Sequence, residues 1–153
     1  MTPYNGDPKI PGDFGQPDSV LFVIDEFVRN DLKLKYAPIT AFNTFSALLK
    51  TDQHKAYEYG KEVLATPTYG ESAYNSIISV IEWWSDKITL HSEIYELGAE
   101  AYQAEIDHMP YPEIANIPKF YNKMADWYWR ANNKSKAIDA GKKAIKAMKK
   151  SKR

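Results

Sequence analysis

The sequence predicts an all-α protein built from repeated helical hairpins. Apolar residues recur at the three- and four-residue spacing of a helix face from residue 18 to the end of the chain. No part of the chain offers a set of partner strands that could pair into a sheet. A related ten-residue segment, with glycine at its sixth place, occurs three times, at residues 55–64, 93–102 and 136–145.

The three glycines of this segment set the period of the repeat. Gly60, Gly98 and Gly141 are separated by 38 and 43 residues, which is the spacing of a helix–turn–helix repeat unit. Each glycine then falls inside the second helix of a hairpin, where glycine costs about 1 kcal/mol relative to alanine. We expect all three to let a neighbouring helix approach closely.

The first 17 residues predict an irregular arm or linker. They contain four of the nine prolines and three of the seven glycines. Proline removes a backbone donor and glycine raises the entropic cost of order, so neither favours a helix. Residues 18–153 are then expected to form a single helical repeat domain, a size that suits one hydrophobic core.

An N-terminal helix is expected directly after this arm. Asp18 or Ser19 can cap it. Its apolar positions recur at helical spacing and are Val20, Leu21, Ile24, Phe27 and Val28. The run from residue 20 to residue 24 is also compatible with a buried strand, but the lack of partner strands favours the helix.

The remaining helices follow from Pro38 onward. Asp52 can cap the helix that ends near Pro67. Asn132 and Asn133 are expected to form the turn before the last helix, which begins at Lys134 or Ser135. The apolar stripes place these helices near residues 39–49, 52–64, 74–84, 88–106, 117–131 and 134–153. These six helices predict about three hairpins, with the N-terminal helix as an additional element before them.

Motifs for catalysis and for metal binding are missing from the sequence. There is no cysteine, and therefore no disulfide, thiolate metal site or thiol nucleophile. His54, His91 and His108 do not have the spacing of a metal motif. No glycine-rich phosphate loop or nucleophile elbow occurs. We therefore expect no catalytic residue, no cofactor and no metal in this chain.

The charge is balanced overall but segregated along the chain. Residues 134–153 hold nine Lys and Arg and one acid, whereas residues 1–133 hold eleven Lys and Arg and nineteen acids. A neutral chain lacks the general basic field of a nucleic-acid binder, so we expect a solvated basic helix instead. No apolar run approaches the roughly 18 residues that cross a membrane, so no span is predicted.

The stretch from Tyr121 to Ala144 resembles a tetratricopeptide repeat, a 34-residue helical hairpin. The large and small positions of that repeat are matched by Tyr121, Met124, Ala125, Tyr128, Ala137 and Ala144. Gly141 and Lys149 depart from the usual pattern. The resemblance covers the last third of the chain well and the middle third loosely, and it implies a short right-handed superhelix of helical hairpins.

The resemblance also implies a function and a surface. Tetratricopeptide proteins bind protein or peptide partners on a concave face lined by the first helix of each unit. Carried onto the matching unit, this implies a non-catalytic interaction module whose groove consists of Lys119, Asn122, Lys123, Asp126, Trp129 and Arg130. Lys119 and Lys123 resemble half of a clamp for a peptide carboxylate.

Two other hypotheses remain open on the sequence. The tyrosine-rich helices and the final segment also resemble helical accessory regions of bacterial thioredoxin-like proteins, whose redox centre would lie outside this chain. The aromatic load of 4 Trp, 11 Tyr and 6 Phe also suits a glycan binder. A cytoplasmic location is expected if Met1 is the native start, and a periplasmic one if the chain is cut from an exported protein.

Overall fold

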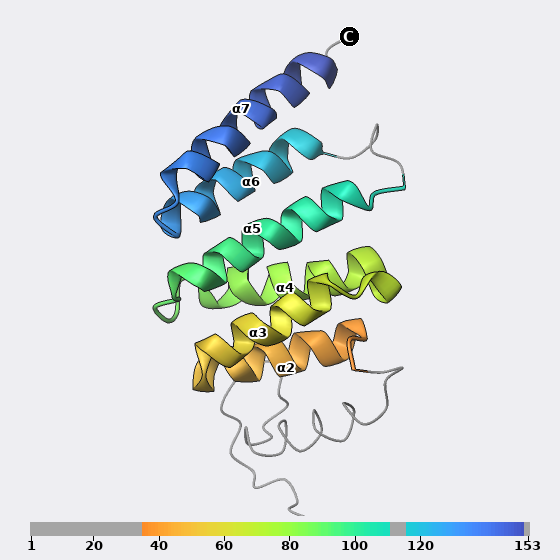
Figure 1. Cartoon of the computed structure of the whole chain (residues 1–153), viewed down its shortest axis with the longest axis vertical. Helices are drawn as coiled ribbons and strands as arrows, with labels where there is room; N and C mark the ends of the chain where they lie inside the picture. Colours follow the sequence, from red (N-terminus) through yellow and green to blue (C-terminus); the bar gives the residue numbers. More distant parts are fainter. Residues whose placement is uncertain (1–34, 111–115, 152–153) are drawn as a thin grey trace, which may run out of the picture.

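The computed structural model describes residues 35–110 and 116–151 (Figure 1). These residues are helical with short connections and contain no strand, which confirms the all-α prediction for this part of the chain. The arm at residues 1–17 and the predicted N-terminal helix lie outside it. The helices are α2 (Pro38–Thr51), α3 (Gln53–Leu64), the short 3-10 helix η1 (Pro67–Tyr69), α4 (Gly70–Trp84), α5 (Ser92–Asp107), α6 (Ile117–Arg130) and α7 (Lys134–Ser151).

Short polar side chains set the helix ends that the sequence predicts. The side chain of Asp52 accepts a hydrogen bond from the backbone N–H of Lys55 and caps α3. Asn132 has a positive φ of 61°, which lets the chain reverse between α6 and α7. Asn133 then accepts a hydrogen bond from the backbone N–H of Lys136 in the first turn of α7.

Helix α5 begins later than its apolar pattern predicts. We expect a helix from Ile88, but α5 starts at Ser92, residues 89–91 are irregular, and His91 before the helix is extended. The side-chain amide of Gln53 explains the difference, because it pairs with this segment. Its Nε2 donates to the carbonyl of Thr89 at 2.9 Å, and its Oε1 accepts from the N–H of His91 at 2.7 Å.

The helices form three hairpins, α2–α3, α4–α5 and α6–α7, which stack along the long axis of the molecule (Figure 1). The first two hairpins pack in parallel layers, with α2 against α4 and α3 against α5. The third hairpin is attached differently, since α6 packs against α5 on one side and against α7 on the other. As a result α7 lies at the end of the stack.

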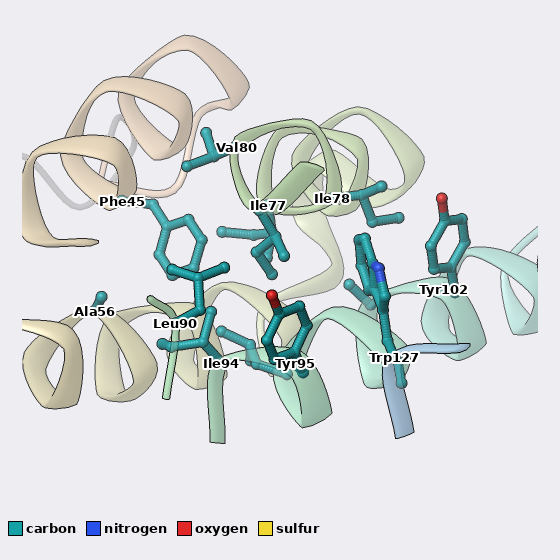
Figure 2. Close-up of a cluster of buried hydrophobic side chains, with 14 of the residues drawn as sticks. Phe45, Ala56, Ile77, Ile78, Val80, Leu90, Ile94, Tyr95, Tyr102 and Trp127 are labelled. Carbon is teal, nitrogen blue, oxygen red and sulfur yellow. The ribbon is translucent and has the colours of Figure 1, made fainter. Parts of the chain in front are cut away.

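A continuous core joins the three hairpins. Figure 2 shows Phe45 of α2, Ile77 of α4 and Ile94 of α5 meeting at the first junction, while Trp127 of α6 approaches Tyr102 of α5 at the second. The Trp127 and Tyr102 rings are tilted, with centroids 5.2 Å apart. Such ring contacts bury large apolar areas and help α6 to attach the third hairpin to α5.

The repeated glycines do not all serve one purpose. A Cβ at Gly60 would overlap the Leu97 side chain of α5, and a Cβ at Gly98 would overlap the Trp127 ring of α6. Close approach is therefore confirmed at these two positions. It is wrong for Gly141, because no described atom lies within 4 Å of a Cβ placed there. The physical reason is that Gly141 faces the end of the stack, where no further hairpin follows among the described residues.

Candidate binding cleft between α4, α5 and α6

A cleft of about 400 Å³ opens where the third hairpin meets the second. Three helices contribute to it, each with residues spaced three or four apart and thus from one face. Its lining consists of Asn75, Ile78, Ser79 and Glu82 from α4, Tyr102 and Glu105 from α5, and Lys119, Phe120 and Lys123 from α6. The cleft thus combines an apolar wall with carboxyl, hydroxyl and ammonium groups.

Tyr102 connects the three helices inside the cleft. Its hydroxyl donates to Glu82 Oε1 at 3.0 Å, and its ring packs on Phe120 with centroids 5.6 Å apart. Lys123 Nζ lies 3.7 Å from the same Glu82 oxygen. Burial, and then the charge of Glu82, raises the pKa of Tyr102 above its usual range, so the phenol stays protonated and acts as a donor.

Glu105 is the unusual group of the cleft. Only 7% of the residue is exposed, and its carboxyl group has no hydrogen-bond or ion-pair partner among the described residues. Burial, and then repulsion from Glu71, raises the pKa of Glu105 to about 7. Near neutral pH this carboxyl is therefore present in both protonation states. A perturbed group of this kind in a cleft is typical of a functional site.

Two of the six predicted groove residues line this cleft. Lys119 is exposed at the rim on the first turn of α6, and the side chain of Lys123, one turn later, is 45% exposed. Both ammonium groups can therefore reach a ligand that enters from solvent. The structure brings them together with Glu105 and Glu82, which the sequence analysis did not single out.

The other four predicted residues do not line the cleft. Asn122 and Asp126 are exposed on α6, and Asp126 pairs with Arg130 at 3.3 Å. The guanidinium of Arg130 lies over a tyrosine ring of α5, 5.8 Å from its centroid. Trp129 is 58% exposed and lies beside the start of α7, with the Nζ of a lysine there 5.7 Å from its ring. Their role in ligand binding stays a prediction.

One sequence signal could have identified Glu105. It follows Ile94, Gly98 and Ala101 at intervals of three and four residues, so it occupies the buried stripe of α5. A carboxylate within such a stripe is rare unless it is paired. Glu82 and Tyr102 gave no comparable signal, because their contact joins α4 to α5 across 20 residues.

Neither a metal cluster nor a membrane span is found in the part of the chain that the structure describes. No group of three or more His, Asp or Glu side chains there could hold a metal ion, and no helix there is long and apolar enough to cross a membrane. Comparison with protein-family models, curated proteins and solved structures finds no match to this chain. The geometry of the cleft is therefore the basis for a functional proposal.

Proposed function

We propose that this chain is a non-catalytic helical-repeat interaction module that binds a carboxylate-bearing peptide in the cleft between α4, α5 and α6. The observation that carries the proposal is that Lys119 and Lys123 share one cleft with the nearly buried carboxyl of Glu105. The layered packing of α2 on α4 and of α3 on α5 supports a tetratricopeptide-like superhelix as its scaffold.

The cleft suits a short peptide segment in size and chemistry. Its volume lies within the range of about 300–1,000 Å³ that ligand sites occupy. Ile78 and Phe120 offer an apolar wall for a side chain, while Lys119 and Lys123 attract a carboxylate. Glu105 in its protonated form can donate a hydrogen bond to that carboxylate, which its ionised form would repel.

The accessory-domain and glycan-binding hypotheses stay predictions. No contact within residues 35–110 and 116–151 favours a redox partner domain. The exposed rings of Trp83 and Trp129 lie on different helices, and each already has a lysine over its face. These rings therefore give no specific support for sugar stacking.

The lysine pair provides the first test. We expect Lys119→Ala/Lys123→Ala to weaken binding of acidic peptides by about tenfold, because two charge-assisted contacts are lost. Lys146→Ala/Lys150→Ala is the matched control, since it removes the same charge from the solvent face of α7. The measurement is an array of peptides with free and amidated carboxyl termini, followed by titration calorimetry at low salt. Failure of the parent to bind, or equal binding by both variants, would contradict the proposal.

Proton uptake by Glu105 provides a second test. With its pKa at about 7, the carboxyl is mostly protonated at pH 6 and mostly ionised at pH 8. If only the protonated form accepts an anionic peptide, the apparent affinity should fall about tenfold from pH 6 to pH 8. Glu105→Gln should remove this dependence while it retains binding. An unchanged pH profile in Glu105→Gln would show that another group controls binding.

A further inference from the structure

The interface between α3 and α5 shows how one copy of the repeated segment is covered. Leu97 of α5 lies directly against Gly60 of α3, where a side chain on the glycine would overlap it. Lys61, the next residue of α3, pairs with Glu100 of α5 at 2.8 Å between Nζ and Oε2. Two neighbouring residues of the repeat thus receive a leucine and a carboxylate that stand three positions apart on the covering helix.

The last copy of the segment presents the same pair of residues. Gly141 and Lys142 of α7 correspond to Gly60 and Lys61 in the alignment of residues 136–145 with residues 55–64. The flanking positions, held by Tyr57 and Leu64 in α3, are also apolar in α7. We define the α7 flank as these four residues of the last copy: Ile138, Gly141, Lys142 and Ile145.

The α7 flank is uncovered among the described residues. Ile138 is 56% exposed and Ile145 is 57% exposed, and nothing described lies within 4 Å of a Cβ at Gly141. The spacing of three, four and seven residues places the flank on one side of the helix. The inner side of α7, which packs on α6, is formed instead by the buried alanines Ala137, Ala140 and Ala144.

The charge around this surface selects its partner. α7 contains seven lysines and a single acid, Asp139. Lys149 follows Ile145 by one turn, so a second lysine borders the flank beside Lys142. The α7 flank of a second copy would bring like charges together, which is unfavourable, whereas an acidic helix would be attracted.

We propose that the α7 flank docks an acidic amphipathic helix of another protein, which places a leucine against Gly141 and a carboxylate on Lys142. This binding site is separate from the cleft between α4, α5 and α6. The mode of binding is a helix laid on an apolar helix face, with anchors spaced three and four residues apart. The notch at Gly141 favours a protein helix over a lipid surface, because it fits one side chain held at a fixed place.

The chain itself supplies the probe for this proposal. The α5 sequence, Ser92–Asp107, contains five acidic and no basic residues, and it carries both Leu97 and Glu100. A synthetic peptide of this sequence, held helical by a lactam on its solvent face, should bind the full chain. Its affinity can be followed by fluorescence anisotropy at low and high salt.

Changes on both sides of the contact should act as a pair. Lys142→Glu should lower the affinity for the α5 peptide by about tenfold. A peptide that carries Glu100→Lys should restore binding to this variant. Gly141→Leu should fill the notch and weaken binding by a similar factor of about ten. Lys143→Glu is the matched control, because no residue of the flank lies three or four positions from Lys143, and this variant should bind the peptide within about twofold of the parent.

Several outcomes would overturn the proposal. One is that the parent does not bind the peptide, or that all variants bind it alike. Another is that the parent self-associates in sedimentation and that Gly141→Leu abolishes this. A third is that Ile138 and Ile145 bind anionic vesicles of phosphatidylserine and phosphatidylcholine and do not bind the peptide. Restored binding by the swapped pair, Lys142→Glu with Glu100→Lys, would support it.

Discussion

Replacing Gly98 by alanine should lower the free energy of unfolding by about 1–2 kcal/mol, although alanine is the better helix former. The added Cβ would overlap the Trp127 ring, and it would also come within 3.0 Å of Ile81 Cδ1. The indole is buried between α5 and α6 and packs on Tyr102, so it cannot turn aside without opening the junction that holds the third hairpin.

Gly141→Ala is the matched control, because the same substitution is made at the same place in the repeat. Nothing described lies within 4 Å of its Cβ, so only the helix propensity changes, and stability should rise by up to about 1 kcal/mol. The stability of Gly60→Ala should lie between those of the other two variants, because the flexible tip of the Leu97 side chain can move away from the added Cβ. Urea unfolding followed by circular dichroism measures all three. Equal stability of Gly98→Ala and Gly141→Ala would show that Gly98 is not a packing position.

Glu105→Gln should raise the free energy of unfolding at pH 8 by on the order of 2 kcal/mol. The pKa of Glu105 is about 7 in the folded protein and near its ordinary value of 4.5 when unfolded. Between pH 4.5 and pH 7 the Glu105 carboxyl therefore holds a proton in the folded state that it has lost in the unfolded state. The contribution of Glu105 therefore stabilises the fold at low pH, declines as pH rises from about 4.5 to 7, and stays low above that.

Glutamine resembles the protonated acid in shape and cannot ionise. The stability of Glu105→Gln should therefore not show the decline with rising pH that Glu105 causes. Asp86→Asn is the control, because it removes one negative charge from an exposed turn. The measurement is the urea midpoint of parent and variants at pH 5 and pH 8. A parent whose stability does not fall between these values, relative to Glu105→Gln, would mean that the carboxyl is solvated in the folded protein.

The helices and their inward faces could be predicted from the sequence because both follow from local spacing. Met124 and Tyr128 are buried, as their places in the repeat predict. The pairs of neighbouring aromatics also divide as helix geometry requires. Trp84 is buried and Trp83 is exposed, because consecutive positions lie about 100° apart.

The cleft could not be predicted, because it depends on which helices meet. Lys119 and Lys123 were selected through the resemblance, but Glu105 and Tyr102 acquire their properties only when α4, α5 and α6 come together. Trp129 was assigned to the same groove, yet its ring lies beside Lys134 at the other edge of α6. Gly141 was assigned the packing role of Gly98, although the sequence has no signal that α7 ends the described stack.

We propose that the cleft between α4, α5 and α6 binds a carboxylate-bearing peptide, and NMR can locate this site on the protein. The most direct measurement is a map of backbone amide shifts in two-dimensional NMR spectra of the full chain, titrated with the best peptide from the array. We predict that the perturbed amides cluster at Glu82, Tyr102, Glu105, Lys119 and Lys123, and that Lys119→Ala/Lys123→Ala raises the Kd read from these shifts by about tenfold. Shifts that cluster elsewhere, or a Kd that is unchanged in the double variant, would contradict the proposal.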